Sequence, residues 1–307
     1  MGCNKLIGHL AAAGAYSIFG FNIIFNKDLA NSGTVSPMVL FVLRTAGATA
    51  LFWLLSFFLP KERVPAGDLG RMALASFIGL FVPQMTFLFA ISMATPIDSA
   101  VLGSLTPVYT MCFAFLFLRE PITFKKAGGV AMSLLGALLL IYNSVNAIGG
   151  VERTRPLGVI LLLMNGLSFA AYLGSFRPLI SRYGVVTLMK WMFLFALLLS
   201  LPFAWNPLVQ TDFAALTPKL GWELAYIIVF ATFVAYFLIP IGQKHLRPTL
   251  VSMYSYLQPM ITAGVSIAVG MDLFTWQKAL AAVLVFGGVF LVSRSRAAAN
   301  DPAVTRK

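Results

Sequence analysis

The sequence predicts an all-α membrane protein with ten transmembrane helices, arranged as two inverted five-helix repeats. Three observations lead to this prediction. The 307 residues are 59% hydrophobic and only 10% charged, whereas about a quarter of the residues in soluble domains are charged. Apolar runs of about 18 or more residues recur, and each is long enough to cross a hydrocarbon core of roughly 30 Å. One long segment also matches a second segment further along the chain.

The apolar runs are uniform, which excludes barrel strands because those alternate polar and apolar residues. Segments containing Pro, Gly, Asn or charged residues separate the runs, and none is long enough to fold as a soluble domain. The polar stretch 294–307 is expected to be a disordered cytoplasmic tail. The breaks fall at Asn31–Gly33, Pro60–Gly67, Thr95–Pro96, Glu120–Pro121, Asn143–Pro156, Ser181–Gly184, Asn206–Pro218, Arg247–Pro248 and Asp272. The expected helices cover residues 6–26, 37–59, 71–92, 96–118, 125–143, 156–177, 185–204, 222–243, 249–270 and 276–293.

The segment from Pro96 to Leu139 matches the segment from Pro248 to Leu291 at an offset of 152 positions, without a gap. Apolar matches are common between membrane helices, but matched prolines and a matched acidic residue are not. We therefore predict a duplication, with the first repeat at 6–143 and the second at 156–293. The informative pairs are Pro96 with Pro248, Pro107 with Pro259, Thr110 with Thr262, Glu120 with Asp272, Thr123 with Thr275, and Gly136 with Gly288.

Basic residues are concentrated on one side of the expected membrane when the N-terminus is placed inside the cell. Fifteen Lys and Arg residues then lie inside, five lie outside, and Arg44 and Lys190 lie within helices. This bias predicts a multi-pass protein of the cytoplasmic (inner) membrane with both termini in the cytoplasm. It also explains the net charge of +12 without a nucleic-acid partner. The loops that are rich in Lys and Arg occupy alternate positions in the first half, and in the second half they occupy the other positions. This is what inverted copies require, because five is an odd number and the second copy then enters the membrane from the opposite side. The outside residues are Lys27, Arg153, Arg155, Lys219 and Lys278.

Several short motifs stand out in the matched segments and in the first helix. They are SLTP at Ser104–Pro107, LREPIT at Leu118–Thr123, the glycine-rich stretch Gly128–Gly136, LRPTLVSMYSYLQP at Leu246–Pro259, GMDLFT at Gly270–Thr275, and Phe19-Gly20-Phe21-Asn22. With these motifs the chain resembles the drug/metabolite transporter superfamily, EamA type, over nearly all of residues 6–293. The family usually has Trp where Phe19 stands. The resemblance implies ten helices in two EamA repeats, with the fifth and tenth peripheral, and a transporter of small metabolites. It does not choose the substrate.

Arg44 is the strongest candidate for a binding residue because it lies about seven residues into the second expected helix. An arginine at that depth costs about 2.5–3.5 kcal/mol on insertion scales, so a role that needs its charge is favoured. Its guanidinium could bind a substrate carboxylate through two hydrogen bonds. The alternative is that the side chain reaches back to the outer headgroups. Lys190, near the inner end of its helix, is interpreted as an anchor of that kind.

Polar residues elsewhere in the apolar runs are further candidates, because such groups face the bundle interior or a water-filled cavity. Asn22 and Asn26 lie one turn apart, and either substrate contact or interhelical hydrogen bonding explains them. Asn165 occupies the corresponding region of the second repeat with Ser168 and Tyr172. The remaining candidates for substrate contact are Gln84, Ser104, Tyr109, Tyr254, Tyr256 and Gln258, and packing with a satisfied hydroxyl is the alternative for the tyrosines.

Three prolines are predicted to form kinks or hinges, since each removes a backbone donor and frees a carbonyl. Pro83 lies in the middle of the third helix beside Gln84. Pro107 and Pro259 lie at equal depth in the fourth and ninth helices. Their kinks are expected to help one half rock against the other.

Carboxylates are scarce and fall near helix ends, so no proton relay stands out. Asp98 is the one candidate for protonation, although capping of the fourth helix explains it equally. No catalytic constellation, metal site or cofactor site is predicted, and an enzyme is not expected. The predicted function is alternating-access transport of small metabolites such as amino acids, moving outward, by a monomer or homodimer in the lipid bilayer. A lipid-carrier flippase and a drug exporter on the same fold are the alternatives.

Overall fold

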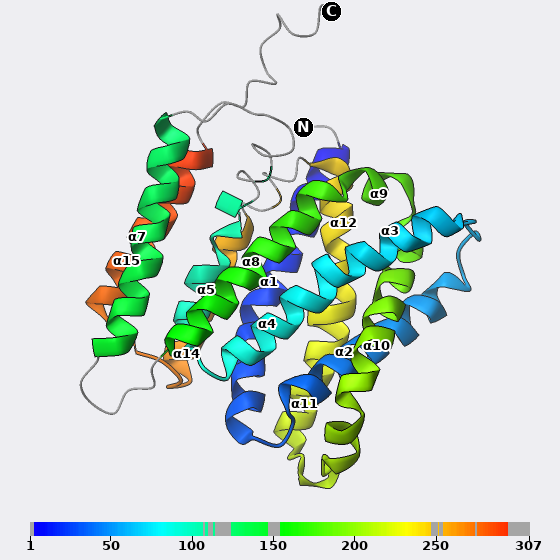
Figure 1. Cartoon of the computed structure of the whole chain (residues 1–307), viewed down its shortest axis with the longest axis horizontal. Coiled ribbons are helices and arrows are strands. Elements are labelled where there is room, and N and C mark those ends of the chain that lie inside the picture. The colour runs from blue at the N-terminus through cyan, green and yellow to red at the C-terminus, as the bar shows by residue number, and fades with distance from the viewer. Residues whose placement is uncertain are drawn as a thin grey trace, which may run out of the picture.

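The computed structural model describes residues 3–106, 108–109, 113, 124–146, 154–246, 251, 254–273 and 275–293. All regular elements in these ranges are helices (Figure 1). They are α1 (Cys3–Ser32), α2 (Pro37–Ser56), α3 (Ala66–Ser76), η1 (Phe77–Phe81), α4 (Val82–Ile91), α5 (Pro96–Gly103), α7 (Phe124–Asn146), α8 (Pro156–Ser175), α9 (Arg177–Arg182), α10 (Val185–Gln210), η2 (Phe213–Ala215), α11 (Pro218–Tyr226), η3 (Ile227–Val234), α12 (Ala235–His245), η4 (Tyr254–Tyr256), α14 (Leu257–Ala268) and α15 (Trp276–Ser293).

Six helical runs in the described ranges are long and apolar enough to cross a membrane. They are Lys5–Ser32, Pro37–Ser56, Ala66–Ile91, Pro156–Ser175, Val185–Gln210 and Pro218–His245. Shorter apolar helices accompany them. In Figure 1 the chain passes repeatedly between an upper end, where α1 begins, and a lower end, where α1 gives way to α2. The arrangement is that of a multi-pass membrane protein.

Three helices that start at the lower end, α2, α5 and α11, share one local signal, a Ser or Thr followed by Pro. Ser36, Thr95 and Thr217 each cap the following helix, and their hydroxyls accept hydrogen bonds from backbone N–H groups three residues on. The proline that follows occupies the first helical position, where no N–H is needed. After α1 the chain turns at Gly33, whose φ of 66° suits glycine.

Two of the membrane-crossing runs contain π-helical segments. The α3–α4 run is interrupted by η1, and the α11–α12 run is interrupted by η3. Moved by the predicted offset of 152 positions, η1 would cover residues 229–233, which lie inside η3. The two π segments therefore match at the offset that the predicted duplication uses.

Several helix ends differ from the sequence prediction. The first helix runs on to Ser32, so Lys27 lies within it and is fully buried, not in an outside loop. The third run begins at Ala66, and α10 continues past Pro202 and Pro207 to Gln210. A membrane helix can contain such prolines because groups from neighbouring helices satisfy the backbone carbonyls that the prolines leave without a donor. The predicted tail 294–307, Pro107 and parts of the expected helices 96–118 and 249–270 lie outside the described residues.

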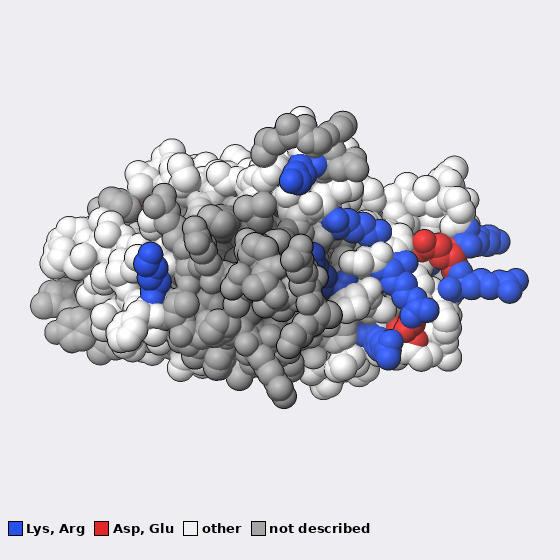
Figure 2. All heavy atoms as spheres, turned by 90° about the horizontal axis from the view of Figure 1, so that it is seen from above, with Lys and Arg blue, Asp and Glu red and all other residues white. Residues whose placement is uncertain are grey.

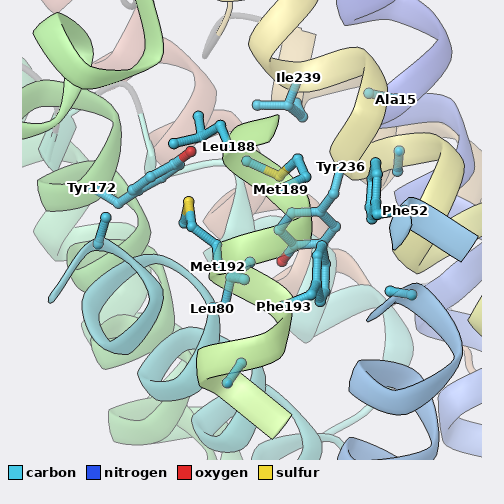
Figure 3. Close-up of a cluster of buried hydrophobic side chains, with 14 of the residues drawn as sticks. Ala15, Phe52, Leu80, Tyr172, Leu188, Met189, Met192, Phe193, Tyr236 and Ile239 are labelled. Atoms are coloured by element: carbon cyan, nitrogen blue, oxygen red, sulfur yellow. The ribbon is translucent and has the colours of Figure 1, made fainter. Parts of the chain in front are cut away.

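The largest apolar cluster lies between α2, α4, α8, α10 and α12 (Figure 3). Phe52 from α2 stacks on Phe193 from α10, with 5.5 Å between the ring centroids. Tyr236 from α12 packs edge-to-face with Phe193, and their ring centroids are also 5.5 Å apart. The pair α7 and α15 pack along each other at one edge of the bundle (Figure 1). The central bundle is therefore held by interdigitated aromatic and aliphatic side chains.

Basic side chains gather on the upper end of the molecule, as Figure 2 shows from above. The segments at that end in Figure 1 are the α2–α3 connection, α9 and the end of α12. Their exposed basic residues are Lys61, Arg63, Arg71, Arg177, Arg182 and Lys244.

Candidate functional site

A cavity of about 90 Å³ lies inside the central bundle. It is lined from α1, α2, α4, α5, α8, α12 and α14, so both predicted repeats contribute. Its wall combines aromatic rings with neutral amides and hydroxyls, and Arg44 is the one charged side chain among the described residues that line it. The lining residues are Tyr16, Phe19, Asn22, Ile23, Arg44, Pro83, Gln84, Phe87, Ser99, Gly103, Thr106, Leu162, Asn165, Phe169, Tyr236 and Gln258.

Arg44 is buried, with 2% of its surface exposed, so it does not reach the headgroups. Its Nε donates a hydrogen bond of 2.9 Å to Thr232 Oγ1 on η3. The Thr232 hydroxyl in turn donates to the carbonyl of Ile227, five residues back, at 2.8 Å. Arg44 Nη1 has no hydrogen-bond partner among the described residues. One edge of the guanidinium is thus fixed, and a buried donor remains for a ligand.

Asn22 lines the cavity and Asn26 does not. The Asn26 amide donates to the backbone carbonyl of Asn22 at 2.6 Å and to its side-chain oxygen at 2.7 Å. Since Asn22 Oδ1 accepts this bond, the amide nitrogen of Asn22 keeps its capacity to donate. Asn26 is fully buried and holds Asn22 in place.

Pro83 and Asn165 meet across the α4–α8 interface. Asn165 Nδ2 donates to the Pro83 carbonyl at 2.7 Å, and both residues line the cavity. Gln84 is 3% exposed, and neither of its amide atoms has a hydrogen-bond partner among the described residues. A buried amide with both atoms unpaired is costly. Gln84 therefore offers a donor and an acceptor to whatever fills the cavity.

A side chain from the neighbouring helix α8 replaces the backbone hydrogen bond that Pro83 cannot make. In a π-helical turn the carbonyl of residue 78 would accept the N–H of residue 83, but proline has none. The Ser168 hydroxyl donates to the Ile78 carbonyl instead, at 2.6 Å. Ser168 thus acts on the backbone and does not line the cavity.

The other predicted site residues are more dispersed. Gln258 lines the cavity, whereas Ser104 is fully buried and its hydroxyl donates back to the Val101 carbonyl at 2.6 Å. Pro259 is the third residue of α14, so it lies in a first turn and makes no break inside a helix. Pro107 lies outside the described residues.

Four predicted tyrosines are not among the described lining residues. Tyr254 shares a hydrogen bond of 2.6 Å with His9 Nδ1, and Tyr256 meets the edge of Phe286. Tyr172 is buried in the apolar cluster (Figure 3). The Tyr109 ring packs against Gly166, where an added Cβ would lie 2.7 Å from the ring. These four side chains contact other parts of the bundle, and their role in substrate contact stays a prediction.

Sequence reasoning missed most of the aromatic wall. Tyr16, Phe19 and Ile23 share one face of α1 with Asn22 through spacings of three and four residues. That periodicity was available in the sequence, but an aromatic stripe on a membrane helix more often faces another helix. Tyr236 lies beside both Arg44 and Gln84.

A bundle of membrane-crossing helices around a partly polar cavity defines the class of multi-pass transport proteins. A family model described as the EamA-like transporter family matches residues 6–142 and 156–294. The chain belongs to this family, which is part of the drug/metabolite transporter superfamily, and it is a membrane transporter, not an enzyme.

Relatives and a solved structure are similar to this chain over at least 90% of its length. The uncharacterized transporter YetK of Bacillus subtilis is 22% identical over 92% of this chain and 86% of its own length. The uncharacterized transporter YyaM of the same organism is 23% identical over 90% and 92%. A crystal structure of a protein with 18% identity superimposes with a TM-score of 0.64, covering 94% of this chain and 95% of that one. This last likeness concerns the fold alone.

Proposed function

We propose that this protein moves a small metabolite bearing a carboxylate, such as an amino acid, across the cytoplasmic membrane by alternating access. The observation that carries the proposal is Arg44. It is buried in the cavity wall and fixed at one edge by Thr232, and its Nη1 has no hydrogen-bond partner among the described residues. A buried cation in a cavity wall favours an anionic partner.

The neutral polar groups of the wall suit the rest of such a substrate. Asn22, Gln84, Asn165 and Gln258 come from four different helices and supply amide groups around one space. Rings from α1, α4, α8 and α12 separate these amides. Because all of these groups surround the same cavity, a molecule bound at Arg44 would contact both halves of the chain.

The size of the cavity favours a small metabolite over a drug. Pockets for drug-sized ligands measure about 300–1,000 Å³, whereas this cavity measures about 90 Å³. A drug exporter or a lipid-carrier flippase would need a larger cavity, or one that opens sideways to lipid. Transport of such compounds, without exchange of small carboxylates, would favour these alternatives.

The proposed architecture is ten membrane helices in two inverted repeats, 6–143 and 156–293, with both termini in the cytoplasm and substrate moving outward. Three features support it. Basic residues gather at the upper end (Figure 2). The π segments η1 and η3 correspond at the offset of 152. The cavity lies where the two halves meet, as in transporters built from inverted repeats.

The test is counterflow of labelled compounds in proteoliposomes that contain the full chain. The panel pairs amino acids and hydroxy acids with their neutral amides. We expect exchange of the carboxylates and not of the amides. Loss of a hydrogen bond to a charged group, about 1.5–3 kcal/mol, should weaken binding by about ten- to a hundredfold in Arg44→Ala, with partial recovery in Arg44→Lys.

Lys190→Ala is the matched control. Lys190 is also a basic residue within a membrane helix, but it lies over the Trp53 ring at 5.0 Å and is not among the described lining residues. It should exchange substrate like the wild type. Equal exchange by Arg44→Ala and the wild type, or transport of the amides alone, would overturn the proposal.

A further inference from the structure

A second buried polar cluster lies at the lower end of the molecule, away from Arg44. It joins Thr95 and Asp98 at the start of α5, Thr154 before α8, Asp272 after α14, and Lys278 on α15. Lys278 Nζ lies 2.6 Å from Asp272 Oδ1, 3.1 Å from Thr95 Oγ1 and 3.8 Å from Asp98 Oδ1. The Thr154 hydroxyl donates to Asp98 Oδ2 at 2.5 Å. We call these five residues the lower-end ion cluster.

The charges of this cluster do not balance. Two carboxylates, 4% and 5% exposed, share one ammonium group that is itself mostly buried. Among the described residues, no other charged side chain makes an ion pair with Asp98 or Asp272. A net negative charge in a buried site is unfavourable. One bound proton would neutralise it.

Asp98 is the carboxylate suited to take that proton. Asp272 holds Lys278 closely and also accepts hydrogen bonds from the backbone N–H groups of Ile97 and Leu273, at 3.1 and 2.8 Å. Asp98 Oδ1, in contrast, is buried with no hydrogen-bond partner among the described residues, and the Lys278 ammonium is 3.8 Å away. Hydrogen bonds to the charged form stabilise it, and Asp98 has fewer of them.

The cluster is also connected to the cavity and to both halves of the chain. Ser99 follows Asp98 directly in α5, lines the cavity, and has a buried hydroxyl without a hydrogen-bond partner among the described residues. Thr95 and Asp98 belong to the first proposed repeat, Asp272 and Lys278 belong to the second, and Thr154 lies between the two. A movement of one half against the other therefore changes this cluster and the cavity wall together.

We propose that Asp98 is a proton-binding site that couples transport to proton movement. Lys278 lies six residues after Asp272 and is bound to it, so these two form one ion pair. In the closed cluster Asp98 has no counter-charge of its own and holds a proton on its carboxylate oxygen. When α15 separates from α5 and water reaches Asp98, the hydrated carboxylate releases the proton to water, and it takes a proton from water again when the cluster closes. The coupling rests on the proposed transport function, whereas the proton-binding site does not.

Infrared difference spectroscopy of the purified full chain tests the site without a substrate. Spectra recorded across a pH series, with isotope-labelled aspartate, should contain a carbonyl band of a protonated aspartic acid. The band should vanish in Asp98→Asn and persist in Asp28→Asn. Asp28 is the matched control, since it is a lower-end carboxylate paired with Lys219 at 2.5 Å. Lys278→Gln should move the band's midpoint to higher pH, because removing a cation favours the protonated form.

Unchanged melting temperatures would show that these variants fold. A band that persists in Asp98→Asn, or that vanishes only in Asp272→Asn, would overturn the assignment. So would a protein that shows no such band at any pH.

Transport assays distinguish the coupling to proton movement from the proposed transport function. For a panel compound that the wild type exchanges, Asp98→Asn should still exchange it at equal pH but lose accumulation driven by a pH gradient. Normal gradient-driven accumulation by Asp98→Asn would overturn the coupling. If the wild type exchanges no carboxylate, the proposed function fails, and the infrared experiment still decides the proton site.

Discussion

Gly47 lies at the closest contact between α2 and the π segment η3. A Cβ at this position would lie 2.3 Å from Ile228 Cγ2, more than about 1 Å inside the usual carbon–carbon separation of ~3.5–4.0 Å. Ile228 is β-branched and stiff at χ1, so it cannot easily swing away. Gly47→Ala must therefore push α2 and η3 apart.

The Arg44–Thr232 hydrogen bond crosses the same interface one turn away. It measures 2.9 Å, and a separation of even ~0.7 Å would stretch it beyond the useful range. Overpacking costs about 1–3 kcal/mol, and the better helix propensity of alanine offsets about 1 kcal/mol of that. Losing a hydrogen bond to a charged group adds about 1.5–3 kcal/mol. We expect a net loss of about 1.5–5 kcal/mol together with impaired substrate exchange.

Thermal melting in detergent and counterflow in proteoliposomes measure the two effects. Gly70→Ala is the control, because a Cβ at Gly70 meets nothing within 4 Å, and it should raise stability by about 0.4–1 kcal/mol. Adding Ile228→Ala to Gly47→Ala should restore exchange, since it removes the clashing methyl group. If Gly47→Ala melts and exchanges like the wild type, the tight α2–η3 contact and its link to Arg44 are both refuted.

Two further predictions concern topology and the Pro83 break. Reporters fused to either terminus should both show a cytoplasmic location, and a C-terminus outside the cell would contradict an even number of membrane crossings. Ser168→Ala should lower stability by about 1–3 kcal/mol, because the Ile78 carbonyl loses the donor that replaces the N–H missing at Pro83. In a Pro83→Ala background, Ser168→Ala should change stability little. If Ser168→Ala lowers stability equally in both backgrounds, the Ser168 hydroxyl does not replace the N–H missing at Pro83.

The helical membrane class was predictable because apolar runs long enough to cross a bilayer are a strong signal in one sequence. Helix ends were less predictable. Lys27 and Pro207 suggested loops, yet both lie within helices, since contacts from neighbouring helices override the local preference. The π segments leave no pattern in a uniformly apolar sequence, because they depend on how α8 and α2 pack against them.

The candidate site was predictable where lipid makes a residue costly. Arg44, Asn22, Gln84, Asn165 and Gln258 were selected because they are polar in apolar runs, and the fold brings them around one cavity. For tyrosines the sequence could not distinguish a cavity position from a position between helices, because a ring packs equally well in both. Tyr254 and Tyr256 shared a helix with Gln258 in the prediction, but they form a 3₁₀ turn that precedes α14.

The π segments bear on the proposed duplication. α2 packs against η3, and α10 packs against η1. Yet 152 positions after Arg44 stands Ala196, and 152 positions before Thr232 stands Leu80, both fully buried. The proposed repeats would thus place a cation at only one of two corresponding positions. A binding site with a single positive charge suits a monoanion better than a dianion.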